Sequence, residues 1–527
     1  MKLIRADLKN RNQWEEKGIR LPEYDIDAVI KETSENPEWV HFGAGNIFRG
    51  FIGSINQQLL NSGETKTGIV AVETFDYDII DMIYKPHDNL TLSVMMDAQS
   101  NLDMEVLASI ADGVKGNELE KLRKIFANPS LKLLSFTITE KGYAIYGLDG
   151  QFMKIVAEDI ANGPEAPKHA MSLTAAMLYH RYTSGGYPLA VVSMDNCSHN
   201  GEKLKNSVVA IAKAWVENGF ADKGFIDYLE DKVSFPWSMI DKITPRPSDK
   251  VKAQLEQLGM EGMDPIVTSK NTYIAPFVNA ETAQYLVIED DFPNGRPPLE
   301  KAGVYMTTRE IVNKAETMKV TTCLNPLHTA LAVFGCVLGY TSIWEEMRDA
   351  ELSKLVRLIA EEGIKVVIDP GIIDPKEFSR EVIEERLPNP NIPDMPQRIA
   401  TDTSQKVGIR YGETIKSYLK SDTLNTKDLR GIPMVIAGWM RYLLSVDDEG
   451  NRFERSSDPM LDELTKKLEG IEFGNPDSLK GQLKDILSND TLFGVNLYEA
   501  GIGEKIEDYF RSMLRGKGAV RDTLKSL

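Results

Sequence analysis

A lysine, an asparagine and a histidine occur within ten positions near residue 320. Lys319, Asn325 and His328 lie in the stretch 316–328, and the chain of 527 residues has only six histidines. A lysine can move the proton when a carbonyl and an alcohol are interconverted, while neutral donors hold the oxygen. The alternative is structural: Lys319 is solvated, Asn325 caps a helix and His328 packs inside it. The rest of the chain is needed to choose between these interpretations.

A catalytic lysine requires an unusual environment. A free lysine has a pKa near 10.4, so it is a base at neutral pH only where its charged form is disfavoured. Lowering that pKa by ~3 units takes about 4 kcal/mol of desolvation or repulsion from other cations. A closed cleft could supply the desolvation. Glu316, one helical turn before Lys319, could pass protons to solvent.

Composition limits the partners of the chain. The formal net charge of −18 and the pI near 5.0 argue against nucleic acid or an anionic membrane as the main partner. The three cysteines have no metal-binding spacing, so neither a metal site nor a disulfide framework is expected. The N-terminal residues lack the apolar core of a signal peptide, so we expect none, and we expect residues 329–340 to form a buried helix rather than a membrane span. These features favour a cytoplasmic protein with a small-molecule partner, either a monomer or a small homo-oligomer.

The periodicity of apolar residues changes along the chain. β-rich runs alternate with helical patterns up to about residue 290, which predicts a doubly wound, mostly parallel Rossmann-like sheet. The predicted strands are 39–42, 67–72, 90–95, 131–139 and 189–194. Nearly everything after the proline-rich loop 292–298 has helical periodicity. We therefore expect an α/β domain over 1–295, including an N-terminal extension, and an all-helical domain over 296–527.

A glycine-rich loop joins the first predicted strand of this sheet to a helix. Gly43 permits the tight turn, and Gly45 lets backbone N–H groups approach a pyrophosphate at the helix N-terminus. The residues of this loop predicted to bind the cofactor are Gly43, Gly45, Asn46, Ile47, Phe48 and Arg49. Phe48 occupies the place of the usual third glycine. Arg49 is either a phosphate contact or a surface residue.

An acidic residue ends the next strand. Glu73 is placed to accept the hydroxyl groups of an adenosine ribose, or it is simply a solvated strand end. The nearby Asp76 and Asp78 are acidic, and no arginine is close in sequence. A 2′-phosphate would meet like charge there, so the sequence favours NAD over NADP.

With these pieces placed, the chain resembles the polyol-specific long-chain dehydrogenases, the mannitol dehydrogenase family. The resemblance covers almost the whole length and depends on several short blocks in a shared order. These are Leu21–Asp25, the Gly43 loop, Ser135–Tyr143, Ser193–Gly201, Phe235–Pro245, Val287–Pro297 and Glu316–His328. The family resemblance implies a metal-independent, NAD-linked oxidoreductase whose active site lies between the Rossmann and helical domains.

The resemblance also assigns residue roles. It implies that Lys319 is the catalytic acid/base, that Asn196 and Asn325 bind the reacting oxygen, and that His328 binds substrate. The lower-ranked matches for substrate binding or proton relay are Asp241, Glu316, Arg386 and Glu140. Asp241 could equally cap a loop, as could Glu140, and we expect His41 and His199 to be structural or positional.

The substrate that the resemblance favours is a keto sugar acid. Overall similarity points to reduction of fructuronate to mannonate, with Arg386, Lys406 and Arg410 as possible partners for the carboxylate. Tagaturonate reduction and mannitol oxidation are the alternatives. Outside the enzyme class, the chain could be a catalytically silent dinucleotide-binding sensor.

One spacing departs from the family. Five residues separate Lys319 from Asn325, where relatives usually have four. On a regular helix, at about 100° per residue, Lys319 and His328 would point apart. Pro326 disfavours a continuous helix, and suits a helix start with Asn325 as N-cap. We therefore hypothesise that one helix ends near 321–323 and another begins at Asn325, with the extra residue taken up in the break or in a π-bulge.

Overall fold

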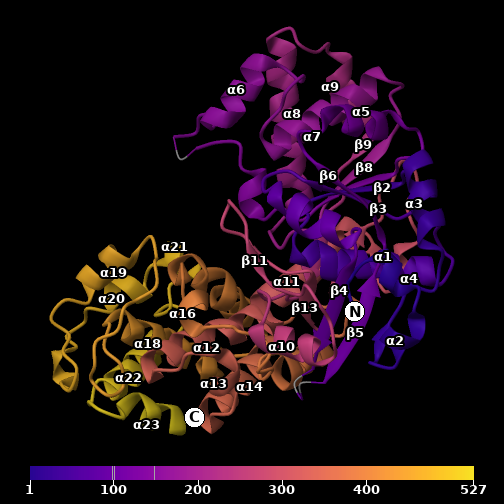
Figure 1. The fold of residues 1–527 in the computed structure, drawn as a ribbon. Helices are drawn as coiled ribbons and strands as arrows, with labels where there is room; N and C mark the ends of the chain where they lie inside the picture. Colours follow the sequence, from indigo (N-terminus) through magenta and orange to yellow (C-terminus); the bar gives the residue numbers. More distant parts are fainter. Residues whose placement is uncertain (98, 100, 148) are drawn as a thin grey trace. The chain divides into compact units, whose positions relative to one another are not determined.

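The computed structural model describes residues 1–97, 99, 101–147 and 149–527, which form two compact units. The first comprises Met1–Met96 and Asn101–Asn313, coloured mainly indigo to magenta in Figure 1, and the second consists chiefly of Lys314–Leu527, orange to yellow. The sequence placed the boundary at 295, 18 residues earlier (313 − 295). The reason is strand β15 (Tyr305–Thr307), which follows the proline-rich loop and pairs with β14 (Tyr285–Glu289) of the first unit.

The first unit contains the predicted doubly wound sheet. Its six strands are all parallel, in the order β6-β3-β2-β7-β8-β9, which is the 3-2-1-4-5-6 order of dinucleotide-binding folds. The strands are β6 (Ile110–Lys115), β3 (Ile69–Glu73), β2 (Trp39–Phe42), β7 (Leu133–Phe136), β8 (Leu189–Ser193) and β9 (Val233–Ser234). The Rossmann-like prediction is therefore confirmed.

Helices cover both faces of this sheet, as a fully buried parallel strand requires. Val40 and Phe42 of β2 face one core, with α5 (Leu119–Ala127), α7 (Ala170–Thr183) and α8 (Asn200–Glu217). Trp39 and Ala71 face the other core, with α4 (Gly53–Asn61). The alternation of side chains along each strand produces these two layers.

One predicted strand belongs to a different sheet. The run 90–95 forms β4 (Thr91–Met96), which pairs antiparallel with β5 (Leu102–Leu107) and parallel with β13 (Phe277–Glu281). The order of this sheet is β1-β5-β4-β13, where β1 is Ile19–Arg20. A short apolar run predicts a strand but does not identify its partners, and one of them here, β13, lies far away in sequence.

Long helices form the interior of the second unit. The most buried are α12 (Asn325–Leu338), α14 (Ala350–Ile364) and α18 (Gly431–Leu443). Helix α14 is separate from the preceding α13 (Ile343–Met347), because the Asp349 carboxylate accepts the N–H groups of Glu351 and Leu352 and begins a new helix.

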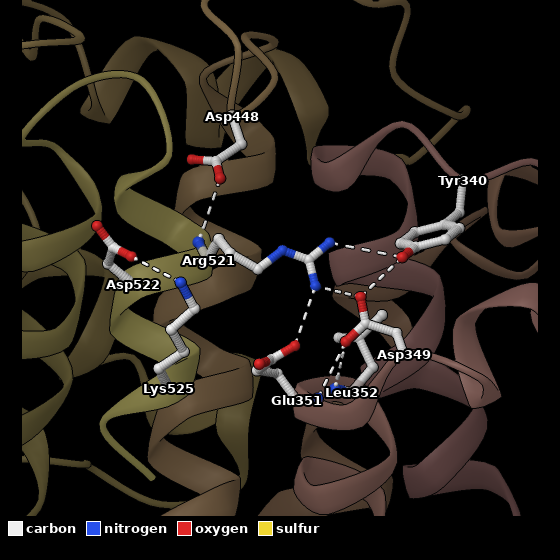
Figure 2. A network of polar contacts seen from close by, with 8 residues as sticks. All are labelled: Tyr340, Asp349, Glu351, Leu352, Asp448, Arg521, Asp522 and Lys525. Atoms are coloured by element: carbon white, nitrogen blue, oxygen red, sulfur yellow. Dashed lines mark hydrogen bonds and ion pairs between the residues drawn. The ribbon is translucent and has the colours of Figure 1, made fainter.

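A polar network fixes the C-terminal helix α23 (Ala519–Lys525) to this interior (Figure 2). The guanidinium of Arg521 donates to Asp349, to Glu351 Oε2 at 3.3 Å and to the Tyr340 hydroxyl at 3.5 Å. Asp448 accepts the backbone N–H groups at the start of α23, at 2.8 and 3.2 Å. The last helix is thus bound both at its N-terminus and by its one arginine.

The helical stretch Arg309–Leu338 is long and apolar enough to cross a membrane by length and composition. However, 72% of its apolar window is buried inside the structure, as in the core helix of a globular domain. The sequence prediction of a buried helix over 329–340 agrees with this burial, although it missed the apolar character that the longer stretch has.

Candidate active site

The segment after Lys319 is a π-helical turn. Helix α11 (Arg309–Met318) leads into η6 (Lys319–Cys323), where the N–H of Leu324 donates to the carbonyl of Lys319 at 3.2 Å, five residues back. Leu324 leaves helical geometry at φ −129° and ψ −63°, and α12 begins at Asn325. The π-bulge and the break at residues 323–325 are therefore both present, as hypothesised from the spacing.

The helix start differs by one residue from the prediction. Leu324, not Asn325, is the N-cap, and its carbonyl accepts the N–H of His328 at 3.1 Å. Asn325 is the first helical residue and Pro326 the second, a place where proline lacks only an N–H that has no helical acceptor. Within the described residues the Asn325 side chain makes no hydrogen bond, and it is partly exposed. Its amide is thus not used for capping.

Lys319 is 1% exposed, so the interpretation of a solvated lysine is wrong. It is the first residue of η6, which packs against α14 and α15 (Pro375–Glu381). Glu316, one turn earlier on α11, is partly exposed, as a residue that exchanges protons with solvent needs to be.

His328 has an acidic partner that the sequence did not suggest. Its Nε2 lies 2.6 Å from Asp394 Oδ2, the distance of an ion pair, although the geometry is not that of a linear hydrogen bond. Asp394 also pairs with Arg398. Burial opposes the charge on Asp394, but His328 and Arg398 outweigh it and the pKa of Asp394 is lowered. The interpretation of His328 as a purely apolar packing residue is therefore wrong.

Two further cation-bearing segments of the second unit are also π-helical. Arg386 ends η7 (Val382–Arg386) and is 5% exposed, and Arg410 lies within η9 (Gly408–Gly412). η9 packs against both η6 and α12. π-Turns are rare in proteins and concentrate at functional sites, so these segments support a site in this part of the second unit.

Candidate residues in the first unit follow its strands. Asn196 is exposed in the loop after β8, and Asp241 ends β10 (Ser238–Asp241) with 7% exposure. Glu140 is exposed and forms an ion pair with Lys203 of α8, so it is held to that helix. Next to Asn196, Asp195 accepts the N–H groups of residues 138 and 139 at 2.9 Å each. The loops after β7 and β8 are therefore joined at the carboxyl edge of the sheet.

The two remaining histidines of interest have positional roles, as expected. His41 is fully buried between the hydroxyls of Ser135 and Thr137, at 2.6 and 2.8 Å. Burial holds its pKa well below the usual value, so it is neutral. His199 stacks on Trp237 with ring centroids 4.3 Å apart.

Gly43 and Gly45 occupy the carboxyl end of β2, next to β7, which is the switch point of the strand order. Gly43 has φ +105°, and a Cβ there would lie 2.2 Å from the carbonyl oxygen of Thr137. Only glycine fits that position. A Cβ at Gly45 would meet nothing within 4 Å. The backbone at Gly45 is therefore open to a ligand such as a pyrophosphate.

The first turn of the following helix contains Asn46, Ile47, Phe48 and Arg49. Its leading N–H groups have no helical acceptor, which suits an anion. Phe48 is buried and stacks on His41 at 4.1 Å, so only its backbone can face a ligand. Arg49 is 1% exposed and donates to Ala275 O at 2.8 Å and Thr91 Oγ1 at 3.2 Å. The surface interpretation of Arg49 is therefore wrong, and its guanidinium is held inside the unit.

Glu73 is 7% exposed, which excludes a solvated strand end. Its carboxylate accepts the N–H groups of Ala44 at 2.9 Å, Phe75 at 2.9 Å and Asp76 at 3.1 Å. Burial raises its pKa against the effect of these three bonds. A carboxylate has about four lone-pair directions, so one remains for a ribose hydroxyl. Glu73 thus also fixes the glycine loop through Ala44.

A lysine lies near the end of the Glu73 strand, and nothing in the local sequence indicated it. Phe75 is 69% exposed, and the ammonium of Lys270 lies 5.2 Å from its ring centroid. The turn that carries Lys270 is held by Asp76, which accepts the Thr268 hydroxyl at 2.6 Å, and by Asp78, which accepts the Ser269 N–H at 2.8 Å. A cation is therefore present at an edge where the local sequence showed only acids, and no local signal could have placed it there.

Comparison with known proteins agrees with this geometry. Residues 37–301 match the mannitol dehydrogenase Rossmann domain, and residues 312–513 match the mannitol dehydrogenase C-terminal domain. The chain is 55% identical to D-mannonate oxidoreductase of Thermotoga maritima, over 100% of this chain and 99% of the relative.

Two solved structures are similar over nearly the full length. A substrate-free D-sorbitol dehydrogenase has a TM-score of 0.79 at 26% identity, covering 96% of this chain and 97% of that one. The ternary complex of Pseudomonas fluorescens mannitol 2-dehydrogenase with NAD and D-mannitol has a TM-score of 0.72 at 25% identity, covering 100% and 99%. With a strand–glycine loop–helix at the switch point of its sheet and both family domains in order, the chain belongs to the mannitol dehydrogenase family.

Proposed function

We propose that this protein is an NAD-dependent oxidoreductase that reversibly reduces a keto sugar acid, fructuronate, to its aldonate, mannonate, without a metal. The observation that carries the proposal is the buried Lys319 at the head of a π-turn that leads directly into Asn325 and His328. The 55% identity to a D-mannonate oxidoreductase supports the choice of substrate.

Each side chain has a role set by its chemistry. Protonated Lys319 donates to the carbonyl oxygen during reduction and takes the proton back during oxidation. Asn196 and Asn325 donate N–H bonds to that oxygen as negative charge develops on it. His328, oriented by Asp394, holds a neighbouring hydroxyl. Glu316 exchanges the proton of Lys319 with solvent, and Asp241, Arg386 and Glu140 are the further candidates for substrate contact.

The glycine loop fits a dinucleotide. The open backbone at Gly45 and the first turn from Asn46 to Arg49 would hold the pyrophosphate, and Glu73 has one lone-pair direction left for the ribose. When bound, NADH supplies the hydride. Acidic Asp76 and Asp78 support NAD over NADP, and a direct comparison of NADH and NADPH affinities, with Lys270→Ala alongside, tests that choice.

Turnover on a small panel of substrates tests the function. NADH oxidation is measured with fructuronate, tagaturonate and fructose, which separates the proposed reductase from a tagaturonate reductase and from a mannitol 2-dehydrogenase. We expect the highest kcat/KM for fructuronate. Equal inactivity on all three would contradict the substrate class.

A lysine substitution separates an enzyme from a silent dinucleotide-binding sensor. In Lys319→Ala, turnover should collapse while NADH binding is largely kept, because Lys319 moves the proton and does not hold the dinucleotide. Lys420→Ala, at the exposed end of α17 (Glu413–Lys420), is the matched control and should behave as wild type. A sensor would bind NADH equally well in both forms and show no turnover for Lys319→Ala to remove.

The cellular setting follows from charge and substrate. A sugar acid and NAD are small molecules, and the net charge of −18 disfavours nucleic acid and anionic membranes as partners. We place the protein in the cytoplasm as a monomer or small homo-oligomer. Size-exclusion chromatography with light scattering tests the oligomeric part.

A further inference from the structure

Lys406 and Arg410 are two cations one helical turn apart, since the N–H of Arg410 donates to the carbonyl of Lys406 at 2.9 Å. Their charged groups contact only neutral acceptors. Lys406 Nζ donates to the carbonyl of Ile399 at 3.2 Å and to that of Thr401, and Arg410 Nη1 donates to the Thr329 hydroxyl. Both side chains are partly exposed, so a small anion can reach them.

Neither cation forms an ion pair with any residue that the structure describes. Asp402 and Asp458 are the acids whose charge Lys406 feels, but Asp458 accepts the N–H and hydroxyl of Ser404 at 2.8 and 2.5 Å. Burial, followed by the charge of Arg410, lowers the pKa of Lys406 to about 8, and burial lowers that of Arg410 to about 10. Two adjacent cations without an anion are costly to desolvate, and such an arrangement is typical of a ligand site.

Arg410 contacts the beginning of helix α12, which carries the proposed substrate-binding residues Asn325 and His328. The Thr329 hydroxyl accepts a hydrogen bond from the Arg410 guanidinium, and Thr329 directly follows His328 in sequence. The same hydroxyl donates to the carbonyl of Asn325 at 3.0 Å. The next residue, Tyr411, donates its hydroxyl to the carbonyl of Pro326 at 2.8 Å. Arg410 and Tyr411 are therefore hydrogen-bonded to the N-terminal part of α12.

The segment that carries Arg410 is tightly packed. A Cβ at Gly412 would lie 1.8 Å from the carbonyl oxygen of Phe493, and one at Gly408 would lie 2.9 Å from that of Leu492. Both glycines thus let the η9 backbone lie directly on the backbone around residue 493. A guanidinium on such a rigid support is preorganised for a planar, bidentate ligand.

The acid nearest to His328 does not neutralise these cations. The Asp394 carboxylate already pairs with His328 and Arg398, and no ion pair joins it to Lys406 or Arg410 among the described residues. Lys406 and Arg410 therefore leave a local positive charge in a chain that has 79 acidic and 61 basic residues.

We propose that Arg410, with Lys406 one helical turn away, binds the carboxylate of the substrate and thereby selects sugar acids over neutral polyols. The inference rests on the proposed function, since it places the far end of the same substrate. In a six-carbon keto acid, the carbonyl end lies at Lys319, Asn325 and His328, and the carboxylate end at Arg410. A guanidinium matches a carboxylate with two parallel N–H bonds, and the ammonium adds charge.

Fructuronate and fructose test the proposal, because they differ at one terminal carbon, a carboxylate in one and a hydroxymethyl in the other. In Arg410→Met, kcat/KM for fructuronate should fall by about 30-fold or more, mainly through KM, as a lost charge-assisted contact predicts. Activity with fructose should stay within about threefold, because the hydroxymethyl group makes no charge-assisted contact. Arg410→Lys should recover part of the loss.

Equilibrium binding of mannonate and mannitol to the NADH-bound enzyme gives the same comparison without turnover. Arg410→Met should weaken the binding of mannonate and leave the binding of mannitol unchanged. Arg357 is a surface arginine of the same unit that pairs with Glu384, and Arg357→Met should change the binding of neither. An equal loss for acid and polyol, or an unchanged preference for the acid, would overturn the carboxylate assignment. A wild-type enzyme inactive on every keto sugar acid would instead overturn the proposed function.

Discussion

Replacing Glu346 with glutamine is expected to change how the stability of the protein depends on pH. Glu346 of α13 is fully buried, and neither carboxyl oxygen has a hydrogen-bond partner among the described residues. Its carboxyl lies over Gly335 of α12, where a Cβ would be 2.2 Å from Oε1. Burial, followed by the charges of Asp394, Asp349 and Glu345, raises its pKa well above the usual value. As the pH rises, the folded protein therefore keeps a proton on Glu346 beyond the pH at which the unfolded chain loses it.

The size of the effect follows from proton linkage. In the unfolded chain a glutamate has a pKa of about 4.3. Between that value and the raised folded pKa, the folded state keeps a proton that the unfolded state has lost. The free energy of unfolding therefore falls by about 1.4 kcal/mol per pH unit across this interval, and the contribution of this group is fully present only below pH ~4.3. Glutamine cannot ionise, so Glu346→Gln removes this slope.

Chemical denaturation of both proteins between pH 5 and pH 8 measures the slope. The amide introduced by Glu346→Gln would leave hydrogen bonds unmade at a cost of about 1–3 kcal/mol, but that cost is the same at every pH. The difference in unfolding free energy, variant minus wild type, should therefore rise steadily with pH. Parallel curves would refute the reasoning, because they would mean that Glu346 ionises alike in the folded and unfolded states.

Three further predictions concern the site. Asp394→Asn should lower kcat/KM about 10- to 100-fold, as the loss of a residue that orients a functional histidine does; an unchanged KM and kcat would remove Asp394 from the site and leave His328 without an orienting partner. Deleting Val320, which shortens the π-turn to the spacing of relatives, should retain the fold and measurable activity, because residues outside the bulge keep their register; complete unfolding in circular dichroism would contradict this. Gly43→Ala should destabilise the protein by at least ~2 kcal/mol in denaturant titrations, since both its φ and its space require glycine, whereas Gly45→Ala should fold normally and weaken NADH binding in fluorescence titrations.

Local sequence patterns predicted those parts of the fold that local forces control. The glycine loop follows its strand, and Pro326 marks a helix start. The partners of strand β4 and the end of the first unit were not predictable, because both depend on strands that arrive from β13 and β15.

In the candidate site, too, some features were predictable from local sequence and others were not. The break before Asn325 follows from a proline that cannot continue a helix. The sequence left open whether Lys319 is solvated, and only the packing of the second unit shows that it is buried. The capping residue was misplaced by one, since Leu324 adopts the cap conformation that we assigned to Asn325. Arg49 was assigned to a phosphate or to the surface, and only the packing of β4 and the residues before β13 shows why it is buried.

The sequence by itself determined that this chain has a dinucleotide-binding sheet, a helical second domain and a lysine–asparagine–histidine segment with a backbone irregularity. Those features depend on the periodicity of apolar residues and on the steric limits of glycine and proline. Both act between residues that are close in sequence. Tertiary structure alone decided that Asp394 meets His328, that Glu73 holds Ala44 and that Arg410 lies on Thr329. Charge pairing and desolvation depend on distances in space, and residues 29 to 81 positions apart carry no local signal that they will meet.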